Sequence, residues 1–326
     1  MNANYTVRTS RTVKSFLDYL LPSASHWKSA IRGDLAYRGQ ASSSWSLVPK
    51  AFRRDVVVGY GLGAKTGGLD RVLPQAQSEF EAVHEFVKAA DGAGLQITET
   101  GGRLLLQEDP RHIFSDPDWE YAWPQEEVLE TLALAQHHGV PTRLLDFTED
   151  PLMAAFFAAS EAWDPKEGKP REGSDRKYLA VWVVDLRFLR AISSIRNRYP
   201  ERIREVRVPR ANNSYLHAQL GFFLVDRGAN DIIARREPLS LESAIAQRAE
   251  FWHYGDRLRG NGIRRQTWFD ELPIKKVRIS TDQTGELLRE LENRGVSRGT
   301  LMPSLDRVVE SLEFQRTFPY TAVTET

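Results

Sequence analysis

Apolar residues recur at helical spacing in several stretches of the chain. In residues 75–90, hydrophobic side chains return every three or four positions and would occupy one face of a helix. Residues 152–163 are apolar nearly all round, which predicts a buried helix, and Asp150 followed by Pro151 is a suitable start for it. Helices are predicted over residues 13–21, 75–90, 124–138, 152–163, 284–293 and 305–314.

Shorter segments have the composition or the alternation of β-strands. Residues 178–185 form a near-continuous apolar run that is typical of a buried strand, whereas residues 274–279 alternate. Strands are predicted over residues 34–39, 45–49, 142–147, 178–185, 220–225 and 274–279. They alternate with the helices irregularly, without the rhythm of a doubly wound sheet. The sequence therefore predicts the α+β class, with a mixed sheet flanked by helices.

The composition narrows the functional classes. The 326 residues include 44 Lys and Arg, 44 Asp and Glu, and no Cys. Without cysteine there is no disulfide framework, no cysteine-ligated metal site and no thiol nucleophile. A formal net charge of zero argues against a broad, non-specific nucleic-acid binder, which would need a basic excess. Arginines are concentrated in residues 202–210 and 257–265, which leaves a local basic face available for an anionic partner.

Membrane and export signals are not recognisable in the sequence. No stretch reaches the ~18 apolar residues that a membrane helix requires, and the first twenty residues lack the apolar region of a signal peptide. We therefore expect a cytoplasmic protein with no membrane partner. Residues 59–68 are glycine-rich but contain no nucleotide-binding glycine motif, so a surface loop is expected there.

Three segments contain more polar residues than the packing of a hydrophobic core requires. The first is Tyr37-Arg38-Gly39-Gln40, at the end of a predicted strand. An arginine fork suits a phosphate or a carboxylate, and a neighbouring glycine would let a ligand approach the backbone. A turn glycine beside a structural ion pair would explain the same residues.

The second segment, residues 136–148, concentrates His, Thr, Arg and Asp. His137 and His138 are consecutive on a predicted helix and would point about 100° apart, so they are poorly placed to share a metal ion and no metal site is predicted. Asp146 could fix the tautomer of a histidine or pair with Arg143. Alternatively, the segment is a helix C-cap followed by a buried strand whose polar groups satisfy loop amides.

The third segment, residues 212–222, is polar up to Gln219 and then enters a predicted strand. A glutamine in such a position commonly pairs with backbone groups, and this structural explanation stays open beside a functional one. No G-x-S-x-G elbow occurs in the chain, so serine hydrolysis is not predicted.

Taken in order, these segments resemble the FRG domain family, which is named for a Phe/Tyr-Arg-Gly motif. Here the motif is Tyr37-Arg38-Gly39-Gln40, and the most specific block is AQHHGVPTRLLD at residues 135–146. Later blocks of the family are matched by Gln219, Gly221 and Phe223 and by LMPSLD at residues 301–306.

The resemblance extends over most of the chain. It implies an FRG domain at residues 30–314, a helical lead-in at residues 1–29 and a tail at residues 315–326. The chain departs from the usual family pattern just after the second block, where Phe147 and the pair Asp150-Pro151 replace a tryptophan and an Asn-Pro pair.

The order of elements is also similar to that of ADP-ribosyltransferases, and this resemblance implies an ADP-ribosyltransferase-like fold with NAD as the substrate. Arg38 and Gly39 would lie where that family grips NAD, and Thr148 with the helix behind it would match the middle motif. Gln219 lies where a catalytic glutamate is expected. An amide cannot act as a base or counter a positive charge as a carboxylate does.

Two sets of residues would form the site that this resemblance implies. The predicted catalytic set is Arg38, Asp146 and Gln219, in which Asp146 orients a neighbour and Gln219 touches the nicotinamide ribose. The predicted NAD-binding residues are Tyr37, Arg38, Gly39, Gln40, His138, Thr142, Arg143 and Thr148.

Two functional hypotheses follow from the sequence. In the first, the protein is an NAD-dependent, ADP-ribosyltransferase-like enzyme that modifies a protein or a nucleic acid. Such an enzyme would act as a bacterial toxin or phage-defence effector, with a regulatory or antitoxin protein as a further partner. In the second, the same residues form a non-catalytic module that binds a nucleotide, a nucleic acid or a protein.

Overall fold

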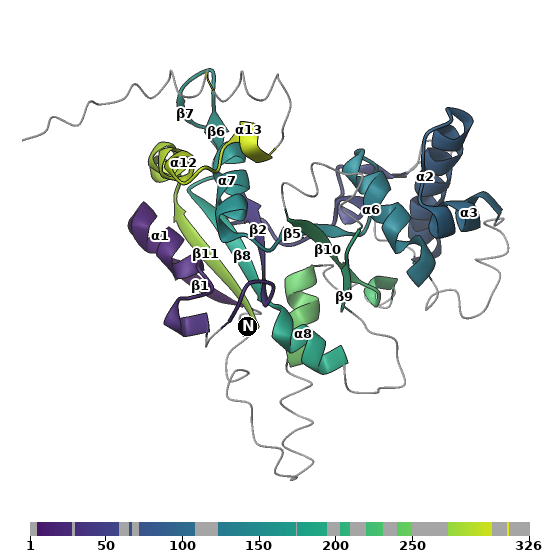
Figure 1. The fold of residues 1–326 in the computed structure, drawn as a ribbon, viewed down its shortest axis with the longest axis horizontal. Helices are drawn as coiled ribbons and strands as arrows, with labels where there is room; N and C mark the ends of the chain where they lie inside the picture. The colour runs from purple at the N-terminus through teal and green to yellow at the C-terminus, as the bar shows by residue number, and fades with distance from the viewer. Residues whose placement is uncertain are drawn as a thin grey trace, which may run out of the picture.

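The computed structural model describes residues 5–27, 30–58, 65–66, 72–107, 123–173, 175–193, 203–208, 220–230, 240–249, 273–301 and 312. One sheet contains β1 (Thr6–Thr9), β2 (Leu35–Gln40), β5 (Leu145–Thr148), β8 (Tyr178–Asp185), β9 (Ile203–Val206), β10 (Gly221–Asp226) and β11 (Ile274–Ser280). Its strand order is β1-β11-β8-β2-β5-β10-β9 (Figure 1). β1 runs parallel to β11, and the other neighbouring pairs are antiparallel.

Helices cover both faces of this sheet. α1 (Val13–Leu20), α7 (Pro151–Ala162) and α12 (Thr284–Asn293) pack on one face. α8 (Leu186–Ser193) and the helical residues 241–249 pack on the other. At the end of the sheet formed by β10 and β9 lie α2 (Val72–Gly92), α3 (Glu99–Gln107) and α6 (Leu129–His137) (Figure 1). The α+β class and the mixed sheet flanked by helices are thus confirmed.

Smaller elements connect these helices and strands. The short helices are η1 (Ser25–Trp27), η2 (Lys50–Phe52), η3 (Glu126–Val128), η5 (Thr281–Gln283) and α13 (Arg298–Leu301). Two small hairpins join β3 (Val57–Val58) to β4 (Lys65–Thr66) and β6 (Trp163–Asp164) to β7 (Lys169–Pro170). No helix among the described residues has the length and hydropathy needed to cross a membrane.

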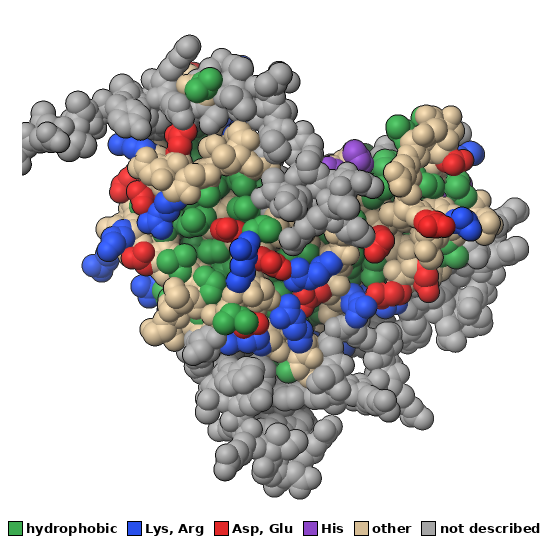
Figure 2. All heavy atoms as spheres, viewed as in Figure 1, with side chains coloured by type: hydrophobic (Ala, Val, Ile, Leu, Met, Phe, Trp, Pro, Cys, Tyr) green, Lys and Arg blue, Asp and Glu red, His purple; other side chains and the backbone are tan. Residues whose placement is uncertain are grey.

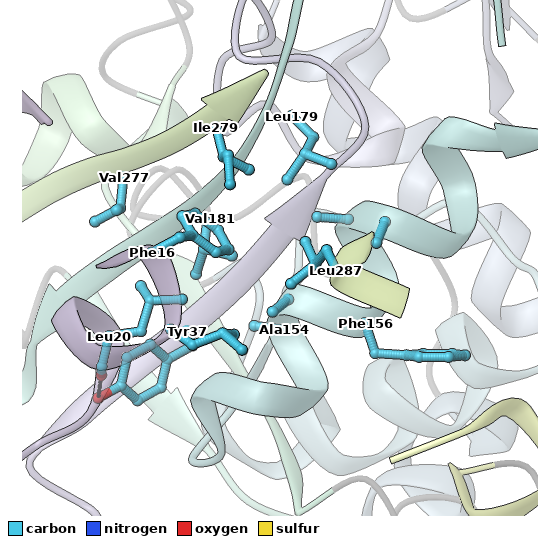
Figure 3. Close-up of a cluster of buried hydrophobic side chains, with 14 of the residues drawn as sticks. Phe16, Leu20, Tyr37, Ala154, Phe156, Leu179, Val181, Val277, Ile279 and Leu287 are labelled. Carbon is cyan, nitrogen blue, oxygen red and sulfur yellow. Dashed lines mark hydrogen bonds between the residues drawn. The ribbon is translucent and has the colours of Figure 1, made fainter. Parts of the chain in front are cut away.

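The core beneath α7 is built from alternate positions of adjacent strands. Successive strand residues point to opposite faces, so Tyr37, Val181 and Val277 from β2, β8 and β11 enter the same layer. Phe16 of α1 and Leu287 of α12 meet them there (Figure 3). This layer fixes the position of β2, which carries the first polar motif.

β10 contributes to two further cores through the same alternation. Phe222 and Leu224 belong to the core with α8, whereas Phe223 and Val225 belong to the core with α2 and α6. The helices beyond the sheet are therefore attached to it through the side chains of β10.

The strand predicted over residues 45–49 is wrong. The segment has no regular secondary structure. The N–H of Leu47 donates to the carboxylate of Glu242 at 2.9 Å, and the carbonyl oxygen of Leu47 accepts from the N–H of Leu241 at 3.0 Å. Leu47 and Pro49 are buried. Their alternation with exposed positions therefore reflects burial under residues 241–249 rather than pairing with another strand.

β1 and α3 were not predicted. β1 is exposed along its whole length, so its sequence lacks the apolar alternation that marks a half-buried strand. α3 contains Gly101 and Gly102, and glycine disfavours a helix. A Cβ atom at Gly101 would lie 2.4 Å from the carbonyl oxygen of Glu127, so glycine is required where α3 passes close to η3. The helix predicted over residues 305–314 lies almost wholly outside the described residues.

Candidate functional site

The second polar segment folds into a helix end, a tight turn and a strand. α6 ends at His137, and Gly139 takes the left-handed conformation with φ +97°. The N–H of Gly139 donates to the carbonyl of Gln136 at 2.9 Å, and the following N–H donates to the carbonyl of Ala135 at 3.0 Å, as in a Schellman motif. The chain then turns into β5, and this reversal brings Gln136 beside Asp146.

Side chains from three elements form one hydrogen-bonded chain here. The hydroxyl of Thr142 donates to the amide oxygen of Gln136, and the amide nitrogen of Gln136 donates to Oδ1 of Asp146. Oδ2 of Asp146 accepts from Nη1 of Arg38 at 2.6 Å. The hydroxyl oxygen of Thr142 accepts from the N–H of Leu144 at 3.2 Å, which sets the direction of the chain. Asp146 is therefore held as an acceptor, in its ionised form.

Arg38 lies where two central strands separate. β2 and β5 are paired at a single register position, Tyr37 opposite Thr148, whereas β2 pairs with β8 along its whole length. Beyond that position, Nη1 of Arg38 donates to the carbonyl of Asp146 at 2.7 Å as well as to its carboxylate. The guanidinium of Arg38 therefore continues the hydrogen bonding between β2 and β5 where their backbone pairing ends. Its Nε is buried and has no hydrogen-bond partner within the described part of the chain.

The carboxylate of Asp146 is ionised and open to solvent. Desolvation by the surrounding protein raises its pKa, but the charge of Arg38 and hydrogen bonds from Arg38 and Gln136 outweigh this effect, so the pKa of Asp146 lies below its ordinary value. The side chain of Asp146 is 59% exposed, whereas that of Arg38 is only 16% exposed. Each carboxylate oxygen has further lone-pair capacity, so it can accept a hydrogen bond from a bound molecule.

Two more side chains lie within the electrostatic field of this pair. Desolvation and the positive charge of Arg38 lower the pKa of Arg53, and Asp146 opposes the shift. Desolvation and the neighbouring His138 lower the pKa of His137, so this imidazole is mostly neutral at pH 7. We refer to Arg38, Arg53, Gln136, Thr142 and Asp146 together as the Arg38–Asp146 site.

The comparison with protein families points to the same part of the chain. The family model of the FRG domain matches residues 33–167, from the start of β2 to just beyond α7. The chain contains an FRG domain. The matched range includes every residue of the Arg38–Asp146 site, while Gln219 and residues 301–306 lie outside it. Searches of curated proteins and of solved structures found no match.

Two residues of the FRG motif belong to the core and not to an open site. Tyr37 is completely buried beneath α1, and its hydroxyl donates to the carbonyl of Leu20 at 2.9 Å (Figure 3). At Gly39, a Cβ atom would lie 2.0 Å from the carbonyl oxygen of Ala154, so glycine is required where β2 passes under α7. Tyr37 and Gly39 therefore have packing roles in the core, and their contact with NAD stays a prediction.

Gln40 and Thr148 are also committed to the fold of the FRG domain. The amide oxygen of Gln40 accepts from the indole N–H of Trp182 at 2.7 Å, and its side chain is buried. The hydroxyl of Thr148 accepts from the N–H of Asp150 at 3.1 Å in the turn that leads into α7. Both residues thus satisfy donors within the fold, and the NAD contact expected of them stays a prediction.

Arg143 forms a buried ion pair away from the Arg38–Asp146 site. Its guanidinium donates to both carboxylate oxygens of Glu79, at 2.6 and 3.1 Å, and to the amide oxygen of Asn230 at 3.2 Å. Its side chain has no exposed surface. The pairing of Asp146 with Arg143 is therefore wrong, because Arg143 points into the core beneath α2. The contact of Arg143 with NAD stays a prediction.

His138 and Thr142 lie on either side of the turn after α6. Thr142 is buried and reaches the site through its hydrogen bond to Gln136, whereas His138 is exposed at the helix end. The rings of His137 and His138 lie edge to face, with an interplanar angle of 79°. Within the described ranges, no three His, Asp or Glu side chains are grouped to hold a metal ion.

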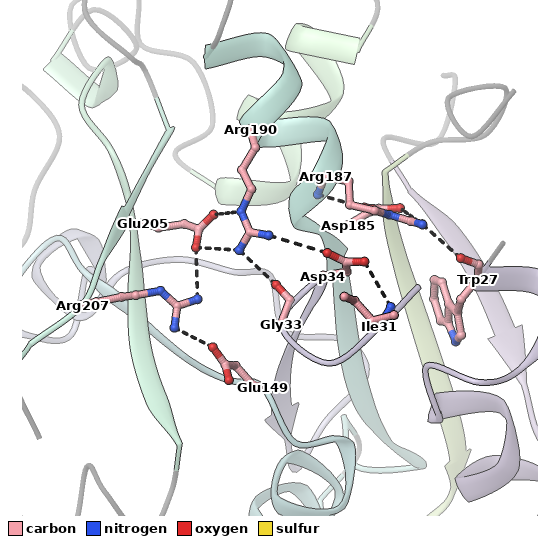
Figure 4. Close-up of polar contacts among 10 residues, drawn as sticks. All are labelled: Trp27, Ile31, Gly33, Asp34, Glu149, Asp185, Arg187, Arg190, Glu205 and Arg207. Carbon is pink, nitrogen blue, oxygen red and sulfur yellow. Dashed lines mark hydrogen bonds and ion pairs between the residues drawn. The ribbon is translucent and has the colours of Figure 1, made fainter. Parts of the chain in front are cut away.

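Gln219 and most of the predicted basic face lie outside the described residues. Arg204 and Arg207 are described, and both are paired with carboxylates. Arg204 lies 2.7 Å from Glu126. Arg207 lies 2.5 Å from Glu149, and Figure 4 shows this pair. Basic and acidic side chains are interspersed on the face shown in Figure 2. The described part of residues 202–210 is thus neutralised rather than an open cationic surface.

Gln136 and Arg53 were not among the predicted site residues, and only Gln136 lies in one of the three polar segments. Gln136 joins the site because α6 reverses into β5 through Gly139. Arg53 joins it because η2 follows the irregular segment that replaces the predicted strand. A polar residue in the last turn of a helix before a Gly-x-Pro turn was the available signal for Gln136.

Proposed function

We propose that the FRG domain binds NAD at the Arg38–Asp146 site and transfers its ADP-ribose to a macromolecule. The observation that carries this proposal is the ion pair of Arg38 with the accessible and ionised carboxylate of Asp146, at 2.6 Å, with the charge of Arg53 close enough to act on both groups. Guanidinium groups suit the pyrophosphate of NAD, and a carboxylate suits ribose hydroxyls.

Asp146 has the charge that the transfer chemistry needs. In ADP-ribosyl transfer the bond between the ribose C1′ and the nicotinamide nitrogen breaks, and nicotinamide leaves with the bonding electrons. A nucleophilic atom of the target then bonds to C1′ and gives up its proton. The carboxylate of Asp146 would counter the positive charge that develops on the ribose, in place of the glutamate that Gln219 replaces. Arg38 and Gln136 would hold that carboxylate in a fixed orientation.

NAD binding and NAD chemistry can be tested separately. Binding is measured by calorimetry and by thermal denaturation, since a ligand at a hundredfold excess over its Kd stabilises the folded state by ~2.7 kcal/mol. Chemistry is measured as nicotinamide release and as transfer of labelled ADP-ribose to components of a bacterial lysate. Arg53→Ala tests the pyrophosphate contact, and Asp146→Asn removes the carboxylate charge. Asp18→Asn is the matched control, because Asp18 is 53% exposed on α1 and Asp146 is 59% exposed.

The expected result is saturable NAD binding that Arg53→Ala weakens about tenfold, with label transfer that Asp146→Asn abolishes and Asp18→Asn leaves intact. A tenfold loss corresponds to about 1.4 kcal/mol of binding free energy. Failure to bind NAD would refute the proposal. Binding without nicotinamide release, with or without lysate, would refute the enzymatic part and favour the non-catalytic module.

As the biological setting, we propose a toxin or phage-defence effector that is restrained by a regulatory protein. The support is the proposed chemistry alone, since modification of a macromolecule with NAD harms the cell in which it is uncontrolled. Inducible expression in bacteria should arrest growth for the unaltered chain and not for Asp146→Asn. Normal growth with accumulation of active enzyme would contradict this role without affecting the biochemical proposal.

A further inference from the structure

A second depression lies at one edge of the sheet, beside β1. It has a volume of about 580 Å³ and is lined by Thr6, Val7, Arg8, Tyr19, His26 and Lys275. β1 is four strands from β5 in the sheet, which at about 4.8 Å per strand places it about 19 Å away. The depression is therefore separate from the Arg38–Asp146 site.

The side chains of the depression are organised by stacking. The guanidinium of Arg8 lies 4.1 Å from the ring centroid of Tyr19, and the ring of His26 stacks on Tyr19 at 3.6 Å with an interplanar angle of 11°. Nε1 of Trp27 donates to the carbonyl of Tyr19 at 2.9 Å, and the ammonium of Lys275 lies 5.1 Å from the Trp27 ring. Cations held against aromatic rings keep their charge and lose little further side-chain freedom when a ligand binds.

The chemistry of the lining favours an anion. The lining includes the guanidinium of Arg8 and the ammonium of Lys275, and the hydroxyl of Thr6 is a further donor. None of the lining residues is acidic. The rings are already stacked on one another, so the depression offers charge and N–H donors more than a free aromatic face.

We propose that this depression binds the phosphate groups of a nucleotide-sized ligand. Arginine and lysine are the side chains that bind phosphate best, and the volume falls within the roughly 300–1,000 Å³ typical of small-molecule sites. A small ligand fits better than a nucleic acid, because an extended polyanion needs a continuous basic track. On α1 next to the depression, Asp18 is 53% exposed and pairs with Lys14 at 4.0 Å, which interrupts such a track.

Inorganic pyrophosphate and ADP are suitable probes, and adenosine is the phosphate-free control. Binding to the full chain is measured by calorimetry at fixed ionic strength. The variant Arg8→Ala/Lys275→Ala removes both cations, and Arg8→Ala alone, on the exposed strand β1, serves if the double variant does not fold. Arg11→Ala is the matched control, because Arg11 is exposed in the same segment and does not line the depression.

We expect pyrophosphate and ADP to bind equally well to the unaltered chain and to Arg11→Ala. Both should bind at least tenfold more weakly to Arg8→Ala/Lys275→Ala. Adenosine should not bind. Equal affinity in all variants, or no saturable binding of pyrophosphate, would overturn the proposal. Binding confined to a single-stranded oligonucleotide would also overturn it and assign the surface to nucleic acid. Arg53→Ala leaves this depression unchanged, so binding that is lost in Arg53→Ala but kept in Arg8→Ala would assign the phosphate to the Arg38–Asp146 site instead.

Discussion

Arg38 and Arg143 show how burial decides the role of a charged residue. Each pairs with a carboxylate at 2.6 Å, but the Arg143–Glu79 pair is almost completely buried, whereas the carboxylate that faces Arg38 is largely exposed. A buried charge that loses its partner is strongly destabilising, while a pair with an exposed partner contributes little to stability. Arg143 is therefore structural, and Arg38 remains available to a ligand even though it also supports the sheet.

Glu79→Ala should reduce the free energy of unfolding by about 3–5 kcal/mol, because it leaves the guanidinium of Arg143 buried without a counter-charge. Gln75, which donates to Glu79 at 3.0 Å, would lose an acceptor as well. Urea unfolding followed by circular dichroism measures the change. Asp18→Ala, which removes an exposed carboxylate, is expected to alter stability by less than about 0.5 kcal/mol. Equal effects of the two substitutions would contradict a structural role for the buried pair.

The contact between β2 and α7 depends on the absence of a side chain at Gly39. A Cβ atom there would lie 2.0 Å from the carbonyl oxygen of Ala154 and 2.7 Å from the backbone nitrogen of Ala158. Backbone atoms cannot move aside without shifting the whole helix. Gly39→Ala should therefore destabilise the protein by at least the ~1–3 kcal/mol typical of overpacking.

The matched control for Gly39→Ala is Gly92→Ala at the end of α2, where a Cβ atom would meet nothing within 4 Å. This control should be neutral or slightly stabilising, because alanine favours a helix over glycine. Thermal denaturation of both variants makes the comparison. Similar melting temperatures would show that α7 adapts and that the glycine of the motif has another purpose.

Gly139→Ala tests the helix end that delivers Gln136 to the site. A Cβ atom at Gly139 would have open space, so the cost comes only from the left-handed backbone, φ +97°, and should be about 1–2 kcal/mol. NAD binding should weaken in parallel if the turn positions Gln136 beside Asp146. A variant with lower stability and unchanged NAD affinity would separate the turn from the site.

The elements that the sequence analysis predicted are those with a repeated burial pattern, such as α1, α7, β8 and β11. β1 lacks that pattern because it is exposed, and the segment around Leu47 imitates a strand because its burial alternates. Arg38 and Asp146 were expected in one site, and they do meet. The sequence did not indicate that they would form an ion pair with each other. Arg38 and Asp146 are 108 positions apart, and their contact depends on how far β2 and β5 stay paired.

At the scale of the whole molecule, the range matched by the FRG family model is not a self-contained sheet. Residues 33–167 supply only β2 and β5 to the seven strands, and these two pair at one position. The main partner of β2 is β8, which lies outside the matched range. A fragment of residues 33–167 should therefore lack cooperative unfolding when it is expressed alone. A fragment with the sharp thermal transition of the full chain would contradict this.

Lys276 lies where distant parts of the chain meet. Its side chain is almost fully buried, and its ammonium donates to the carbonyl of Ser43 at 2.7 Å. It also lies 4.0 Å from the ring centroid of Trp182 and 4.8 Å from that of Tyr5. Desolvation lowers the pKa of Lys276 to about 8, with Arg278 adding to the shift and Glu242 opposing it. The junction between β1 and β11 thus contains a buried lysine whose charge titrates at a lowered pKa.

This charge makes the stability of the molecule depend on pH. Below pH 8 the lysine is protonated in the folded and unfolded chains alike, and the cost of burying the charge is fully present. Between pH 8 and 10 the folded chain releases the proton while the unfolded chain retains it, so the free energy of unfolding should rise by about 2 kcal/mol. Above pH 10 the raised pKa values of Tyr5 and Tyr37 work in the opposite direction, so measurements should stop there.

Urea unfolding at several pH values should show this rise in the unaltered chain. Lys276→Met and Lys276→Arg should both lack it, because neither side chain titrates in this window. An unchanged slope in the two variants would mean that another group carries the dependence.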